Sequence, residues 1–332
     1  MPGIKSLRKI QLGREVTAGT AVVATTMWRG IGTLENLLEV KISDEDVGYI
    51  SGLDRTSIPK KFAGITFDSI EASFEQLLHI FEAGIKTVTP TADGVGTGKI
   101  YTYDFPTTAI NALKTYTIEG GDNQQAQEME YSFVEAFELS GKAGENLMVS
   151  GDWKGRQLTN TTFTPAVAVP TLDDILFSKG KLYIEAIGGT WGTTQKSNTL
   201  LEASLKVKTG LIAKWTADGQ IYFSFNKMTK PEITLEVKLE YDGTAIAEIA
   251  NWEAQTPRLI QLKVEGSALT TPGTAYSFRT LLINLAGKWD KFSKIDEDDG
   301  NDIVTGTFRA RYNATASKFA QIIDVCELAT VP

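Results

Sequence analysis

Apolar and polar positions alternate along most of the chain, and this pattern predicts a protein built mainly of β-strands. The clearest strand-like segments are residues 181–187, 220–225, 232–240 and 305–312. Apolar residues recur with the period of an α-helix in two segments only, residues 73–82 and 244–253. The pattern therefore predicts a mainly β protein with two helices.

The surroundings of the two predicted helices match, which indicates an internal repeat. Before the helices, the match pairs Glu39 with Glu202 and Ile65 with Ile233. After each helix we expect two strands and a closing hairpin: residues 99–103, 114–119 and 130–153 in the first half, and residues 259–264, 279–284 and 302–328 in the second. The order strand, strand, helix, strand, strand, hairpin occurs twice, so we expect a duplicated β module.

The segment between the two halves is rich in Thr and Pro, as an extended linker would be. The sequence thus predicts a first β domain over residues 1–158, a linker over residues 159–172 and a second β domain over residues 173–332.

Composition favours a globular chain that folds in a cytoplasm. The 332 residues are 42% hydrophobic and 22% charged, which suffices for a packed core in each half. No window is apolar enough to cross a bilayer, and the N-terminal residues do not have the pattern of a signal peptide. The net charge of −8 argues against a surface that grips nucleic acid.

The residue types that enzymes use for catalysis are scarce. His79 is the one histidine and Cys326 the one cysteine, so a Ser-His-Asp or Cys-His arrangement and a thiolate metal site have too few members. Residues 94–99 are rich in Gly but have the wrong spacing for a phosphate-binding loop. Residues 296–302 are acidic but do not follow the order of a calcium loop, so a turn is expected there, with a weak divalent-cation site as the alternative. We therefore predict a protein that is not an enzyme and has no cofactor.

Both ends of the chain resemble the tail tube proteins of long-tailed, non-contractile bacteriophages, the siphophages. The opening, residues 12–20, is similar to the Gly-Arg/Lys-Glu-x-Thr-x-Gly-Thr pattern that is common in this family. The closing segments, residues 276–289, 299–300 and 306–313, follow one another as they do at the end of that family. The resemblance implies two tandem tail-tube-type β-sandwich domains, each with one flanking α-helix, whose inner strands form a barrel on oligomerisation.

In this family six such domains form a ring around the lumen, and rings stack into the conduit through which DNA is ejected. With two domains per chain, three copies would fill the six positions, which predicts a homotrimeric, pseudo-hexameric ring. The alternative is a hexamer in which only one half is a tube domain. The resemblance further implies a virion protein of the tail, assembled in the host cytoplasm. Its partners would be itself, the tape measure protein, the tail terminator and baseplate proteins, while DNA passes through without specific binding.

The resemblance places assembly contacts in the long segment between the first two matching strands. We expect an assembly loop there, with a solvated loop as the alternative, at Leu53, Asp54, Arg55, Ile58 and Pro59. A run of acids is a candidate for the lumen wall, with an ordinary exposed face as the alternative, at Asp44, Glu45 and Asp46.

Two other classes of function stay open. Another virion component, such as a tail terminator, baseplate protein or head decoration, would assemble without long stacked tubes. A carbohydrate-binding β-sandwich would need an exposed aromatic platform, for which Trp153, Trp191 and Trp215 are scattered candidates.

Overall fold

The fold was analysed in a computed structural model that describes residues 2–332, and it is mainly β, as predicted. The first half contains α1 (Phe74–Gly84) and the strands β1 (Lys9–Arg14), β2 (Thr26–Trp28), β3 (Gly32–Ile42), β4 (Thr56–Glu71), β5 (Thr91–Ala92), β6 (Lys99–Asp104), β7 (Tyr116–Gly121), β8 (Ala126–Lys142), β9 (Met148–Gly155) and β10 (Leu158–Thr161).

The second half contains α2 (Gly243–Glu253) and the strands β11 (Gly180–Ala186), β12 (Gln195–Lys196), β13 (Leu200–Lys208), β14 (Leu211–Lys214), β15 (Phe225–Met228), β16 (Glu232–Glu240), β17 (Arg258–Ala268), β18 (Phe278–Phe292), β19 (Asp296–Asp298), β20 (Asn301–Ala310) and β21 (Ala320–Cys326). Single 3-10 turns, Lys5–Leu7 and Phe177–Lys179, precede β1 and β11.

Most of the predicted elements are confirmed. Both helices form where the apolar period predicted them, and β11, β16 and β20 cover the predicted strands around residues 181–187, 232–240 and 305–312. The acidic run forms a tight turn between β19 and β20, with positive φ angles at Asp299 and Gly300.

The predicted strand over residues 220–225 is wrong, because β15 begins only at Phe225. Residues 220–224 form a bend instead, in which Ser224 and Thr216 both donate hydrogen bonds to Asp218. Phe223 leaves the alternating pattern and is buried against Tyr131 and Phe133 of β8. A tertiary contact therefore overrides the local strand preference.

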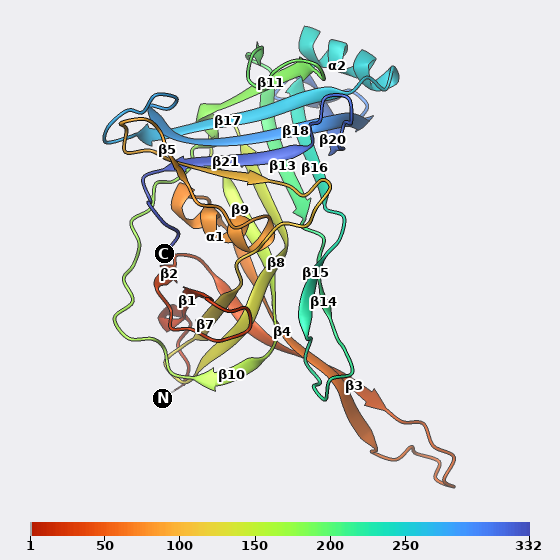
Figure 1. Cartoon of the computed structure of the whole chain (residues 1–332). Coiled ribbons are helices and arrows are strands. Elements are labelled where there is room, and N and C mark those ends of the chain that lie inside the picture. The colour runs from red at the N-terminus through yellow and green to blue at the C-terminus, as the bar shows by residue number, and fades with distance from the viewer. Residues whose placement is uncertain (1) are drawn as a thin grey trace.

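The strands form two layers that share the long strands β8 and β18. One layer is a continuous antiparallel sheet in the order β18–β20–β16–β13–β8–β9–β4–β3, which we call the eight-strand sheet. In front of it, β17, β18 and β21 cross the view of Figure 1 at a steep angle to β13 and β16. Apolar side chains of the two layers meet in one core with α1 between them. The fold is thus sandwich-like.

One order of strand pairing occurs in both halves. In the first half the pairs are β1–β2, β1–β7, β7–β8, β8–β10, β8–β9, β9–β4 and β4–β3. In the second half the pairs, in the same order, are β11–β12, β11–β17, β17–β18, β18–β21, β18–β20, β20–β16 and β16–β13. The helices also occupy equivalent positions: α1 follows β4, and α2 follows β16, the counterpart of β4.

The pairing order corrects the sequence match in three places. After the helices, β7 corresponds to β17 and β8 to β18. The sequence match had instead paired β6 with β17 and β7 with β18, because β5 and β6 are extra strands without counterparts in the second half. Residues 302–328 do not form a hairpin, because β20 and β21 both pair with β18. Before the helices, Ile65 corresponds to Leu235: Ile65 lies between Leu34 and Trp153, and Leu235 lies between Leu205 and Phe308. Leu34 is thus the counterpart of Leu205, so the predicted match of Glu39 with Glu202 is wrong as well.

The two halves are joined by strand pairing as well as by the chain. β13 of the second half pairs with β8 of the first, and β21 pairs with β6. The predicted linker starts within the fold, because residues 158–161 form β10 on β8. The division into residues 1–158, 159–172 and 173–332 stays a prediction.

The two helices begin with capped N-termini but differ in environment. Ser73 accepts a hydrogen bond from the Gln76 amide at the start of α1, and Asp242 accepts two at the start of α2. Nearly all of α1 is buried between the layers, whereas α2 lies on the outside of the second half (Figure 1). Neither helix is long and apolar enough to span a membrane, and this holds for residues 2–332.

His79 should make the fold sensitive to acid. Its Nδ1 lies 3.2 Å from the Tyr116 hydroxyl, and burial, with a smaller contribution from the Arg14 charge, lowers its pKa to about 3. Because the unfolded side chain takes up its proton near pH 6.5, folding stability should fall as pH drops from there towards 3, by up to about 1.4 kcal/mol per pH unit. Denaturant unfolding at several pH values should show a smaller loss of stability for His79→Asn. An equal acid dependence in both proteins would contradict this assignment.

Candidate assembly surfaces

The eight-strand sheet has one face towards the core and an opposite, mainly polar face, which we call the polar face. The polar face carries cross-strand ion pairs, and at Phe62 and Phe133 it packs against the β14–β15 hairpin. Along β13, for example, Ala203, Leu205 and Val207 are buried, and the alternate residues are polar. Six cationic side chains of β8, β9, β13, β16 and β20 each lie within 4.0 Å of a carboxylate: Lys142, Lys154, Lys206, Lys208, Lys238 and Arg309. The polar face thus presents few unpaired cations.

Lys238 lies at the centre of this arrangement. Its ammonium group lies 2.6 Å from Asp298 and 3.2 Å from Glu202, which is also 3.8 Å from Lys142. The hydrogen bond with Asp298 raises the pKa of Lys238 and lowers the pKa of Asp298. Both groups therefore remain charged and mutually compensated at neutral pH.

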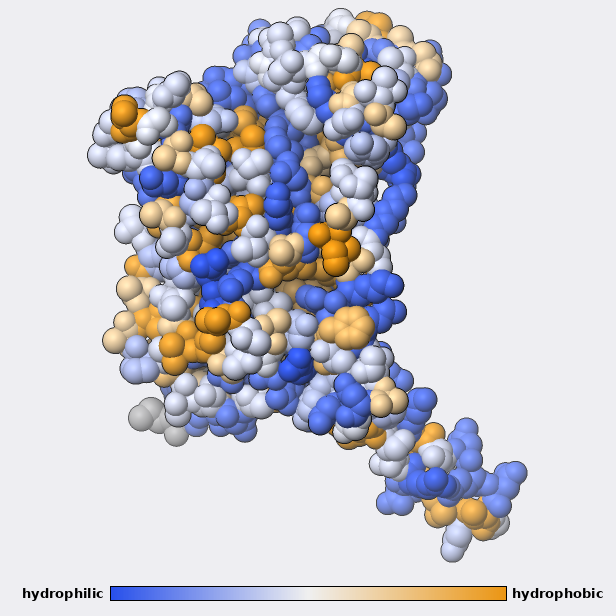
Figure 2. Space-filling view, in the orientation of Figure 1, coloured by the Kyte–Doolittle hydropathy of each residue, from blue (hydrophilic) through white to orange (hydrophobic). Residues whose placement is uncertain are grey.

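An apolar arm projects from the end of this sheet. It consists of the outer parts of β3 and β4 and the loop of residues 43–55 between them, and it extends well beyond the body in Figure 1. Figure 2 shows orange atoms among many blue ones on the arm, mainly near its tip. The exposed large apolar and aromatic side chains of the arm are Leu38, Val40, Ile42, Val47, Tyr49, Ile50, Leu53 and Ile58. A projection with this many exposed apolar groups is typical of a surface that another molecule covers.

All the assembly and lumen candidates from the sequence lie on this arm. Leu53, Asp54 and Arg55 belong to the loop, and Ile58 and Pro59 belong to the first part of β4. The acids Asp44, Glu45 and Asp46 lie on the other side of the same loop, where Glu45 forms an ion pair with Arg55. These acids are therefore not on the polar face of the sheet, and their place relative to a bore stays a prediction.

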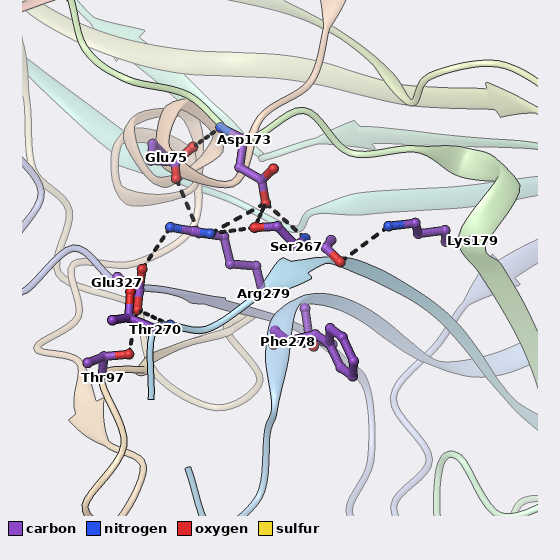
Figure 3. A network of polar contacts seen from close by, with 11 residues as sticks. Glu75, Thr97, Asp173, Lys179, Ser267, Thr270, Phe278, Arg279 and Glu327 are labelled. Atoms are coloured by element: carbon purple, nitrogen blue, oxygen red, sulfur yellow. Dashed lines mark hydrogen bonds and ion pairs between the residues drawn. The ribbon is translucent and has the colours of Figure 1, made fainter. Parts of the chain in front are cut away.

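Arg279, at the start of β18, connects four distant parts of the chain (Figure 3). Its guanidinium group lies 3.7 Å from Glu75 of α1, 3.8 Å from Asp173 before β11 and 2.8 Å from Glu327 after β21. It also donates a 2.5 Å hydrogen bond to Ser267 of β17. Burial raises the pKa of Glu75, although the Asp173 amide and Arg279 partly offset this. The network joins the second half to α1 of the first.

The candidates for catalysis are buried or are used in packing. His79 and Cys326 are buried, and burial raises the pKa of the Cys326 thiol. Residues 94–98 form a loop before β6. The segment between β17 and β18 packs on this loop, and its Ala275 and Tyr276 amides donate hydrogen bonds to the Asp93 carboxylate. Within residues 2–332, no three His, Cys, Asp or Glu side chains lie close enough to hold a metal ion.

The three tryptophans do not share a surface. Trp153 is buried beside Phe67, Trp215 packs on Phe62 and Phe223, and Trp191 donates a hydrogen bond to the Leu285 carbonyl. They therefore do not combine into a platform for a sugar.

Sequence reasoning missed the polar face and the Arg279 network, because both depend on register. The alternation showed that lysines and glutamates share one side of a strand, but the strand that lies opposite was unknown. Arg279 meets residues that are far away in the chain, for which no local signal exists.

No protein-family model matches the chain, and a search of curated proteins finds no match either.

Replacing Arg279 should weaken the connection between the halves. Arg279→Met leaves three carboxylates without their shared cation, and we expect a loss of about 2 kcal/mol or more in the free energy of unfolding. Arg309→Met removes an ion pair that is about half exposed, and should cost less than about 1 kcal/mol. Denaturant unfolding measures both, and equal losses would show that Arg279 is an ordinary surface residue.

Proposed function

We propose that this chain is a structural virion protein that forms the tail tube of a long-tailed bacteriophage. Each half supplies one tube module, three copies form a ring of six modules, and rings stack into a conduit for DNA. The observation that carries the proposal is the repeated pairing order: a four-strand unit of the first half (β3, β4, β9 and β8) and the corresponding unit of the second (β13, β16, β20 and β18) adjoin in one continuous sheet. Adding modules in the same way extends this sheet, and an extended twisted sheet can close into a barrel.

The polar face is suited to line such a conduit. DNA that moves through a tube must not be held by its phosphates, and free lysines would hold it through release of counterions. Lys206 and Lys238 are compensated by carboxylates on neighbouring strands, and the chain as a whole carries a net charge of −8. We therefore infer that the polar face points towards the bore.

The arm is suited to connect one ring with the next. Its exposed apolar side chains extend beyond the body, so they are free to reach a copy outside the plane of a ring. Burying them against another copy would remove apolar area from water at roughly 25 cal/mol per Å². In this arrangement the ring is formed by the sheet, and the arm joins the rings into a tube.

Electron microscopy of the purified protein is the direct test of this function. At high protein concentration we expect rings, and tubes of stacked rings, with a central hole. A protein that remains monomeric under all conditions, with or without a tail extract, would contradict the proposal. Rings that never stack would instead favour another virion component, such as a tail terminator.

Polar substitutions on the arm should separate ring formation from stacking. Tyr49→Asp together with Ile50→Asp should abolish tubes and leave rings, because both side chains are exposed on the arm and away from the sheet. Val95→Asp is a matched control, since Val95 is as exposed but lies in the loop before β6. Microscopy distinguishes the outcomes, and tubes of normal length in the arm variant would exclude the arm from stacking.

Removing carboxylates from the polar face should create an affinity for DNA. Glu138→Gln with Glu202→Gln leaves Lys142 and Lys206 without a partner, so assembled rings should bind a short duplex at low salt and release it at high salt. Glu185→Gln with Glu253→Gln changes the net charge equally but lies on β11 and α2. Fluorescence anisotropy compares the two, and equal binding would argue against a polar face in the bore.

A further inference from the structure

At each end of the eight-strand sheet, one edge has no strand partner within residues 2–332, although the Trp252 side chain donates a hydrogen bond to the Asp290 carbonyl of β18. β3 pairs with β4 on one side only, and the last part of β18, residues 288–292, pairs with β20 on one side only. β19 continues this edge and also pairs only with β20. Free backbone donors and acceptors along an edge are a template for another strand.

The chain contains an example of how such edges pair. By the shared pairing order, β8 corresponds to β18 and β13 corresponds to β3. Within the chain, β8 and β13 pair over seven residues. The free edges of β18 and β3 are therefore the counterparts of two edges that already pair with each other.

We propose that residues 31–37 at β3 of one copy pair antiparallel with residues 291–297 of the next copy, from the end of β18 into β19, in the register of the β8–β13 pair. The proposal rests on the ring of the proposed function and names its lateral contact.

The register follows from irregularities that the halves share. β8 has a bulge opposite Trp153, and β18 has one opposite Phe308, which makes Glu135 the counterpart of Asp290. Glu138 then corresponds to Ser293. On the other strand, Leu34 corresponds to Leu205 because each faces the equivalent residue of β4 or β16.

Lys206 lies opposite Glu138 within the chain, so Glu35 of one copy should lie opposite Ser293 of the next. Two residues back from Ser293 and two residues on from Glu35, Leu37 should lie opposite Lys291, as Lys208 lies opposite Ala136 within the chain.

The charges of the two edges support a second copy as the partner. The cations on β8, β9, β13, β16 and β20 of the polar face have carboxylate partners, but Lys288, Lys291 and Lys294 at the β18 edge form no ion pair within residues 2–332. β3 carries two exposed glutamates: Glu39 forms an ion pair with Lys60, whereas Glu35 forms none within residues 2–332. In the proposed register Glu35 is diagonal to Lys291, so each of these two charges gains a partner of opposite sign.

Cysteine cross-linking tests this register. In the full chain with Glu35→Cys and Ser293→Cys, mild oxidation should give covalent dimers and trimers and nothing larger, because the third link closes the ring. Lys206→Cys with Glu138→Cys is the positive control, since these positions are opposite within one chain and should link without forming oligomers. Glu35→Cys with Ala186→Cys is the negative control, because Ala186 lies on β11 in the other layer. The native Cys326 is buried and can stay.

The outcomes separate the two proposals. Rings in the microscope with no cross-link, while the positive control links, would overturn the edge pairing and leave the tube function standing. Covalent species larger than trimers would overturn closure by three copies. Absence of both rings and cross-links would overturn the edge pairing and the proposed function together.

Discussion

The backbone N–H and C=O groups at strand edges need hydrogen-bond partners, and this requirement determines how the strands of this chain are arranged. β8 is the strand on which this is clearest, because it pairs with β7 and β10 over its first part and with β9 and β13 over its second. The pairing with β13 joins the two halves into one sheet and removes two free edges from the interior of the chain. The two outer edges of the sheet, β3 and the end of β18, have no strand partner within residues 2–332. In the proposed ring, neighbouring copies would supply these partners.

Charge and shape follow the same organisation. Both long strands carry a bulge at the corresponding place, where they pass from one layer to the other. Carboxylates compensate the lysines of β8, β9, β13 and β16 on the polar face, whereas Lys288, Lys291 and Lys294 at the β18 edge form no ion pair within residues 2–332. Buried polar groups are used to hold parts together: Glu82 binds Arg14 and Tyr116 in the first half, and Glu248 binds Arg258 and Trp289 in the second. These two buried glutamates thus connect helices to strands within each half, and such connections would hold together the building block that we propose.

The sequence predicted the local elements well and their partners less well. Alternation and helical period located α1, α2, β11 and β16, because each of these signals lies within one segment. The repeat was visible, but its details after the helices were displaced, because β6 is an added strand whose partner β21 is more than 200 residues away. Phe223 was misplaced for the same reason, since its burial depends on β8. The predicted loop is confirmed only for residues 53–55, because β4 begins at Thr56 and contains Ile58 and Pro59. The polar face could not be predicted without the register between strands.

The mass of the assembled ring tests the central claim most directly. If two modules per chain fill six positions, native mass spectrometry of the ring should give three times the 36.2 kDa mass of the chain. A ring of six chains would contradict the account, because one half of each chain would then lie outside the ring of modules.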